Sequence, residues 1–115
     1  MIGAVSVYVG GTTRETLEEL ASGYDFSAHV LDESESELDV VFEHERVEDF
    51  ASYDFSMVED AVALLDELAS SGCRLRFVEI CYSTNGRESF EKMKNEVSYL
   101  EKHPTIETIE FNGRW

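Results

Sequence analysis

Five stretches of the chain alternate or concentrate apolar residues in the way that β-strands do. In the first stretch Val5, Val7 and Val9 share one parity, which predicts a strand with one buried face. The fourth stretch is densely apolar, so we expect it to be buried on both faces. The last is expected at an edge of the sheet. The predicted strands are residues 2–9, 26–30, 38–43, 75–82 and 106–111.

Three further stretches carry apolar residues at helical spacing. Capping boxes open the first two, at Thr12-x-x-Glu15 and at Ser56-x-x-Glu59. Gly23 and Gly72 end these two helices, as glycine commonly does. The third helix ends before Pro104. The predicted inward residues are Leu17, Leu20 and Ala21 in the first helix, Val58, Ala61, Val62, Leu65, Leu68 and Ala69 in the second, and Phe90, Met93, Val97 and Leu100 in the third.

The predicted order of elements is therefore β-α-β-β-α-β-α-β. The first six match the split βαβ arrangement of ferredoxin-like folds, to which a helix and a strand are added. Neither a linker nor an internal repeat divides the chain, so residues 1–115 are predicted to form a single acidic α+β domain. We expect a mixed or antiparallel sheet with the helices on one face.

Composition limits the functions to be considered. The chain has 115 residues and is 43% hydrophobic, which suffices for a core. It has no apolar run near the roughly 20 residues of a membrane span. Its start also lacks the basic flank and the apolar block of a signal peptide. We therefore predict a cytoplasmic protein of a bacterial or archaeal host, without membrane association, in which Cys73 and Cys81 are reduced thiols.

The net charge of −16 is concentrated in one part of the chain. Between Glu15 and Glu67 there are 18 acids and one base, Arg46, whereas residues 68–115 hold seven acids and seven bases. Such a charge disfavours direct binding of nucleic acid, because phosphates are also negative. An acidic coat for life in high salt should cover the whole surface. The uneven charge instead favours a local patch that recognises a basic protein.

The third predicted strand gives this patch a geometry. Residues of one parity share a face and stand about 6.8 Å apart, which is two steps of the roughly 3.4 Å phosphate spacing along DNA. Acids occupy this parity from Glu35 to Glu45, interrupted by Val41, although a merely solvated face is the alternative. Nearby acids widen the row, and Tyr53 is a candidate anchor. The predicted partner-binding residues are Glu15, Glu18, Glu19, Glu35, Glu37, Asp39, Glu43, Glu45, Glu48, Asp49, Tyr53 and Asp54.

Other chemical sites have weak support. The segment Gly10-Gly11-Thr12 has the position of a phosphate loop but lacks the lysine of that motif. A calcium-loop spacing that starts at Asp32 has Glu37 where glycine is required. The three histidines have no ligand-like spacing, and no nucleophile, base and acid are grouped. We therefore predict no bound metal, no cofactor and no enzymatic activity.

In size, acidity and lack of catalytic motifs the whole chain resembles the small inhibitors carried by phages and mobile elements, above all anti-CRISPR proteins that imitate DNA. This resemblance of type implies an inhibitor that occupies the basic groove of a nucleic-acid-binding effector. An immunity protein that neutralises a basic toxin or nuclease is the alternative, and a halophilic ferredoxin-like housekeeping domain is a third. The pattern leaves open whether the protein is a monomer or a homodimer.

Overall fold

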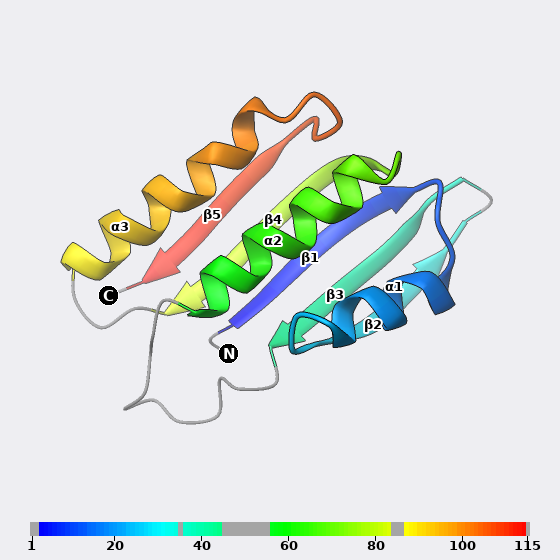
Figure 1. The fold of residues 1–115 in the computed structure, drawn as a ribbon, viewed down its shortest axis with the longest axis horizontal. Helices are drawn as coiled ribbons and strands as arrows, with labels where there is room; N and C mark the ends of the chain where they lie inside the picture. Colours follow the sequence, from blue (N-terminus) through cyan, green and yellow to red (C-terminus); the bar gives the residue numbers. More distant parts are fainter. Residues whose placement is uncertain (1–2, 35, 45–55, 84–86, 115) are drawn as a thin grey trace.

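Five strands form one mixed sheet in the computed structural model, which describes residues 3–34, 36–44, 56–83 and 87–114 (Figure 1). The strands are β1 (Gly3–Gly10), β2 (Phe26–Glu33), β3 (Leu38–His44), β4 (Arg74–Ser83) and β5 (Ile109–Arg114). Across the sheet they follow the order β2-β3-β1-β4-β5. β1 pairs antiparallel with β3 and β4, and β2 pairs antiparallel with β3. β5 runs parallel to β4, which requires a crossover connection between them.

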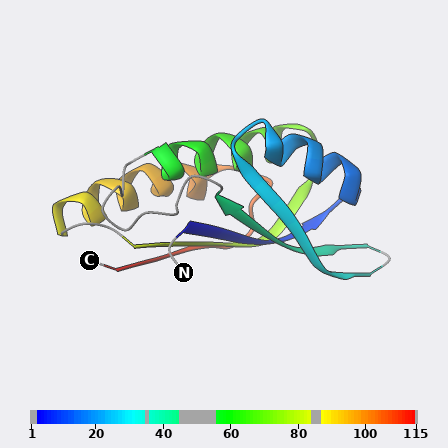
Figure 2. The same ribbon diagram turned by 90° about the horizontal axis from the view of Figure 1, so that it is seen from below.

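The described helices all lie on one face of this sheet (Figure 2). They are α1 (Arg14–Ser22), α2 (Ser56–Ser70) and α3 (Arg87–Ser98), and the 3-10 turn η2 (Tyr99–Lys102) continues α3. α1 packs beside β2 and α3 beside β5, with α2 between them (Figure 1). The predicted single compact α+β domain with a mixed sheet is confirmed. Within the described residues no helix combines the length and the apolar character that crossing a membrane requires.

The start of α1 differs from the prediction by one residue. Thr13, and not Thr12, is the N-cap, with an extended backbone at φ −119° and ψ 161°. Its hydroxyl oxygen accepts a hydrogen bond from the Thr16 amide at 3.3 Å. Glu15 therefore lies in the first turn, where the helix dipole favours a carboxylate, but it does not close a capping box. Gly23 ends the helix, as predicted.

The predicted polar turn over residues 32–36 begins later in the structure. β2 continues through Asp32 and Glu33, and the chain turns between Ser34 and Glu37. The Ser34 amide donates to the Glu37 carbonyl oxygen at 2.9 Å. Because the register of β2 against β3 shifts after Val30, Asp32 comes to lie directly opposite Asp39 of β3.

The core lies between the sheet and the helices. The predicted alternation is confirmed on β1, where Val5, Val7 and Val9 are buried. The predicted inward residues Leu17, Ala21, Ala61, Leu65, Leu68, Ala69, Val97 and Leu100 are buried as well. Leu20 and Val62 are half-buried. The side chains of Val58, Phe90 and Met93 lie outside the described residues.

β4 is buried on one face only, so the prediction that both of its faces are buried is wrong. Val78 and Ile80 are fully buried on the side of the helices. On the other side Phe77, Glu79 and Cys81 are half-buried, and no described helix covers them. The strand is rich in apolar residues because some of them, such as Phe77, lie on the face that no described helix covers. β5 is an edge strand, as predicted, and both cysteines are free thiols.

Candidate interaction surfaces

The structure divides the predicted partner-binding residues between two sides of the molecule. On β3 the core side chains face the helices, so Asp39 and Glu43 point to the opposite side, here named the open face. Glu15, Glu18 and Glu19 are exposed on α1, which lies on the helix side. The remaining predicted residues except Glu37 lie outside the described residues: Glu35, Glu45, Glu48, Asp49, Tyr53 and Asp54.

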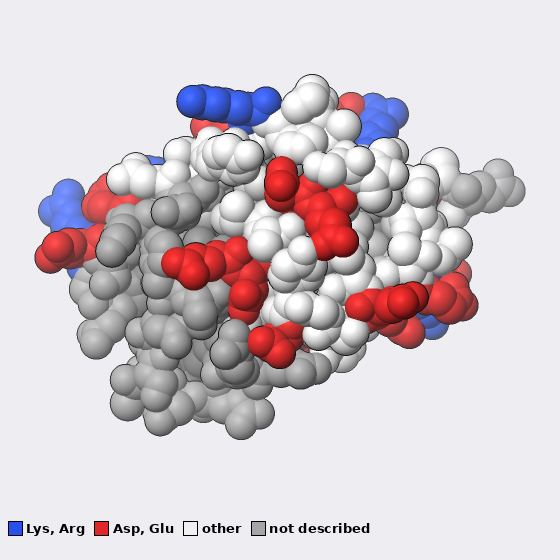
Figure 3. Space-filling view, viewed as in Figure 1, with Lys and Arg blue, Asp and Glu red and all other residues white. Residues whose placement is uncertain are grey.

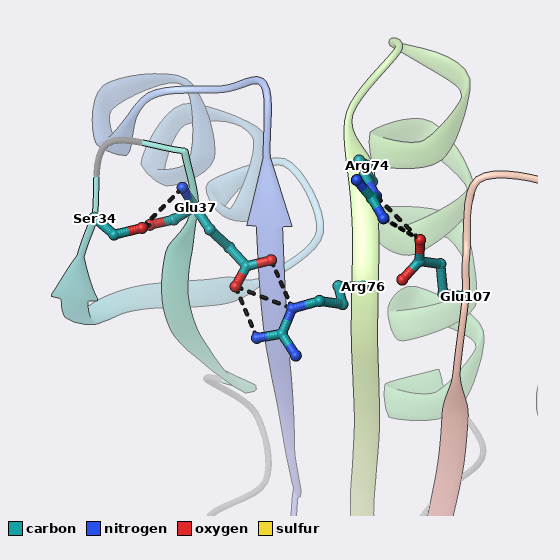
Figure 4. A network of polar contacts seen from close by, with 5 residues as sticks. All are labelled: Ser34, Glu37, Arg74, Arg76 and Glu107. Atoms are coloured by element: carbon teal, nitrogen blue, oxygen red, sulfur yellow. Dashed lines mark hydrogen bonds and ion pairs between the residues drawn. The ribbon is translucent and has the colours of Figure 1, made fainter.

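Glu37 is bound by a guanidinium group, unlike the other described residues of the predicted row. Arg76 Nε donates to both carboxylate oxygens of Glu37, at 3.1 and 2.9 Å, and its Nη2 donates at 2.8 Å (Figure 4). These hydrogen bonds from Arg76 lower the pKa of Glu37 below the usual value for a glutamate. The Arg76 guanidinium also lies 4.5 Å from the centre of the Tyr8 ring. Glu37 therefore does not present an uncompensated charge to a partner.

Three acids of α2 are held in a different way, by imidazole and phenol groups. His44 Nε2 lies 2.9 Å from Asp60 Oδ2, and His103 Nε2 lies 3.7 Å from Asp66 Oδ1. The Tyr24 hydroxyl donates to Glu67, and this hydrogen bond raises the pKa of Tyr24. A neutral phenol fixes the carboxylate of Glu67 in place without cancelling its charge. The bonds tie α2 to β3, to the chain before β2 and to the chain after η2.

Charge is segregated across the sheet. We define the acidic half as β2, β3 and α1, which hold seven acids and one base. The neutral half is β4, β5, α3 and η2, which hold six acids and seven bases. α2 lies between the halves and has four acids and no base. On the helix side, acids lie over α1 and α2, and the basic side chains lie toward the rim (Figure 3). The asymmetry along the chain is thus an asymmetry in space.

A second guanidinium of the neutral half binds a carboxylate in the chain that leads into β5. Arg74 Nε donates to Glu107 Oε1 at 3.1 Å, beside the Arg76 pair (Figure 4). In the acidic half Arg14 Nη2 lies 3.2 Å from Glu33 Oε1, and Arg14 is the one base of that half. The other acids of its described strands and of α1 therefore outnumber the guanidinium groups that are available to them.

Two side chains to which sequence reasoning gave no functional role are buried or half-buried and polar. His44 packs edge-on against Phe26, with ring centres 4.9 Å apart, and its buried Nδ1 atom has no hydrogen-bond partner among the residues that the structure describes. Cys81 is half-buried, and burial followed by a hydrogen bond to Glu79 raises the pKa of its thiol to about 11. A thiol with such a pKa is a poor nucleophile at neutral pH.

The hollows of the described surface are shallow and mixed in chemistry. One of about 530 Å³ lies at the start of α1 and is lined by residues such as Thr13, Arg14 and Glu33. Another of about 330 Å³ lies between α3 and β5, over Ile109 and Phe111. The described lining of these two hollows includes neither an imidazole nor a thiol. Among the residues that the structure describes, no group of three or more His, Cys, Asp and Glu side chains is placed to hold a metal ion.

Sequence reasoning missed three residues of the open face, Tyr8, Arg76 and Phe77. The rings of Tyr8 and Phe77 have centres 6.2 Å apart, and Arg76 covers Tyr8. The sequence did hold a signal for Tyr8, because it alternates with the valines of β1 and must therefore lie on the opposite face of the strand. Comparisons of the chain with protein-family models, with curated proteins and with solved structures found no match, so a function is proposed here from the residues of this chain alone.

Proposed function

We propose that this protein is a small acidic inhibitor that binds the basic groove of a nucleic-acid-binding effector, as a DNA mimic of the anti-CRISPR type. The observation that carries the proposal is the segregation of charge, with seven acids and one base on β2, β3 and α1. Like charges gathered in this way repel one another and destabilise the fold. This loss of stability is explained if the acidic surface serves to bind a basic partner.

The mechanism is steric and electrostatic, without turnover. A negative patch attracts a Lys- and Arg-rich groove, which raises the association rate and makes binding steeply dependent on salt. The bound inhibitor then occupies the space that the nucleic acid would occupy. An effector groove selected to bind phosphates offers the complementary charge.

We also propose that the first six elements form a ferredoxin-like core, to which α3 and β5 are added. The strand order β2-β3-β1-β4 and the antiparallel pairing of these four strands support this assignment. β5 then extends the sheet in parallel beside β4. This core places α1 and α2 over the same face as the added helix.

Affinity capture from a host lysate, with identification by mass spectrometry, tests the function. We expect the wild-type chain to capture a basic effector and to release it as salt is raised. Reversal of three exposed acids in the acidic half, Glu18, Glu19 and Glu43 to Lys, should abolish capture. The matched control reverses Glu88, Glu91 and Glu101 to Lys; these residues are exposed in the neutral half, and the charge changes by the same amount.

The control should capture the effector as well as the wild type does. Equal loss in both variants would contradict the proposal, because capture would then depend on net charge alone. A toxin nuclease as the captured protein would instead identify an immunity protein. A chain that folds only in high salt, which circular dichroism can detect, would favour the halophilic domain.

A further inference from the structure

The open face of the sheet carries aromatic and small side chains that no described helix covers (Figure 2). Strand alternation assigns them to this face, because their neighbours along each strand are buried toward the helices. All are half-buried, and they occupy adjacent strands at the centre of the sheet. They are Ser6 and Tyr8 on β1, Val41 on β3, and Phe77 and Cys81 on β4.

Register places these residues next to one another. Ser6 lies opposite Val41, and Tyr8 lies opposite Phe77. The Tyr8 and Phe77 rings are tilted by 50° with centres 6.2 Å apart. Aromatic side chains at the centre of a surface are the commonest anchors of protein interfaces. The centre of the open face therefore has the composition of an interface core.

Carboxylates stand among these residues in pairs that cost stability. Asp39 lies opposite Asp32, and Glu79 lies opposite Glu110. Like charges directly opposite each other on neighbouring strands are destabilising. Glu79 accepts hydrogen bonds from Asn112 Nδ2 at 2.7 Å and from Cys81 Sγ at 3.3 Å, and both donors are neutral. The charge of Glu79 therefore stays available to a cation from outside.

The acids of this face also decide what could cover it. A second copy of the chain would bring another face that carries Asp39 and Glu79 against these carboxylates, and like charges across an interface repel. A basic segment would instead place Lys or Arg side chains on these carboxylates. It would need apolar side chains as well, in order to cover Val41 and Phe77, whereas Tyr8 already has the Arg76 guanidinium over its ring.

We propose that the open face is the docking surface for a basic amphipathic helix of a partner protein, in which Lys or Arg side chains flank an apolar face. This inference rests on the proposed function, because it names the surface with which the inhibitor holds its partner. The exposed acids of α1 then accelerate the encounter, and the open face determines how long the complex lasts.

A synthetic amphipathic helix of Lys and Leu, roughly 18 residues or five turns long, is the probe. A peptide of Lys and Ser with the same length and charge is the control. Titration of the labelled protein, followed by amide chemical shifts, should perturb Ser6, Val41 and Glu79. We expect the Lys–Leu peptide to bind at least about tenfold more tightly than the control, through the apolar contacts.

Substitutions on each surface separate the contribution of the open face from that of α1. Val41→Lys adds a positive charge at the centre of the face and should lower the affinity for the Lys–Leu peptide by about tenfold or more. Ser6→Lys is a second variant at the neighbouring position, in case the first is poorly folded. Replacing Glu15, Glu18 and Glu19 by Gln should leave the dissociation rate within about threefold of wild type. Shifts confined to α1 and α2, or equal affinity for both peptides, would overturn the proposal.

Analytical sedimentation tests whether a second copy of the chain covers the open face instead. A dimer whose open-face amides are protected from solvent would overturn the proposal of a basic segment. The docking surface and the proposed function can be tested independently. If the peptide binds the open face but no basic protein is captured from lysate, the docking surface is supported and the inhibitor function is contradicted. If an identified effector is still captured by both Val41→Lys and Ser6→Lys, the function stands and the open face is not its docking surface.

Discussion

The acidic half and the neutral half share one sheet but manage charge in opposite ways. In the neutral half acids and bases are nearly balanced, and a guanidinium such as Arg74 binds a carboxylate. In the acidic half seven acids face one base, and Glu43 has an imidazole as its neighbour, with His29 Nε2 at 3.6 Å. Two surfaces of contrasting charge can therefore be supported by one fold.

A common core explains how the acidic half tolerates its own repulsion. Buried residues from both halves belong to a single hydrophobic cluster, which includes Phe42 of β3 and Ile80 of β4. Both side chains are fully buried. Burial of apolar surface is the dominant favourable contribution to folding, and the repulsion of exposed charges is small beside it. The shared apolar core therefore stabilises the fold, and the distribution of charge on the surface can differ between the two halves.

Core truncations in the two halves have the largest expected effect. Phe42→Ala should lower the free energy of unfolding by about 3–5 kcal/mol, and Ile80→Ala by about 2–5 kcal/mol, through lost burial and the cavity that remains. Because the cluster is shared, each variant should still unfold in one transition, followed by circular dichroism in urea. If Phe42→Ala exposed only amides of the acidic half to hydrogen exchange, the halves would be separate folding units.

The bond between His44 and Asp60 joins the acidic half to α2, and its loss should have the next largest effect. His44 is 6% exposed, and Asp60→Ala leaves both of its ring nitrogens without a partner among the described contacts. We expect a loss of about 1–3 kcal/mol in the free energy of unfolding, since an unsatisfied buried polar group keeps its desolvation cost.

A double-mutant cycle isolates this pair, because Asp60 has a further interaction of its own. Once His44→Leu has removed the imidazole, Asp60→Ala should cost less than it does in the wild-type background. Urea titrations of the four proteins measure the coupling. Strict additivity of the two substitutions would mean that the hydrogen bond contributes nothing to stability.

The ion pair between Glu37, which directly precedes β3, and Arg76 of β4 spans β1, and its contribution to stability should depend on pH. The pKa of Glu37 is lowered in the folded protein, chiefly by its hydrogen bonds to Arg76. The pair therefore stabilises the fold fully at pH values above 4.5, the pKa of an ordinary glutamate. This stabilisation is lost as the pH falls through the lowered pKa of Glu37 in the folded protein. The pair is partly exposed, so its contribution should also fall in high salt.

The measurement is the coupling between Glu37→Gln and Arg76→Gln in urea titrations at neutral and at acidic pH. Coupling is expected at neutral pH and should vanish once the carboxylate is protonated. Arg74→Gln is the matched control, because Arg74 binds Glu107 and not Glu37. Coupling of equal size at both pH values would show that the charge of the Glu37 carboxylate is not what couples it to Arg76.

Apolar periodicity predicted most of the fold, because one buried face imposes a period that the sequence displays. Val5, Val7 and Val9 are such a case. The run around Phe77 was misread because a dense apolar strand looks the same whether one or both of its faces are covered. The cap of α1 was misplaced because Thr12 and Thr13 are equally able to cap, and only the backbone conformation distinguishes them.

The candidate surface was predicted less completely than the fold. The sequence shows where acids are numerous, but not which of them meet a cation. Glu37 and Arg76 are 39 residues apart in the chain, and pairing of β3, β1 and β4 brings them together. The division of Glu18 and Glu43 between the helix side and the open face likewise depends on tertiary structure. Long-range pairing thus decides which acids remain uncompensated.

The smallest expected effect is the sharpest test of the comparison, because one substitution should change stability in opposite directions in the two halves. Glu19 of α1 follows Glu15 by four residues, and α1 has no base in its last turn. Glu19→Lys turns a repulsive pair into an attractive one and places a cation at the negative end of the helix. It should raise the free energy of unfolding by about 0.5–1 kcal/mol.

Glu91 of α3 is also exposed, but it stands four residues after Arg87 and three before Lys94. Glu91→Lys therefore creates repulsion and should lower the free energy of unfolding by a few tenths of a kcal/mol. Urea titrations at low ionic strength measure both variants, and added salt should reduce both changes, since exposed charges are screened. A gain of the same size from both would mean that the whole molecule suffers from excess negative charge, and that the two halves do not differ in their local electrostatics.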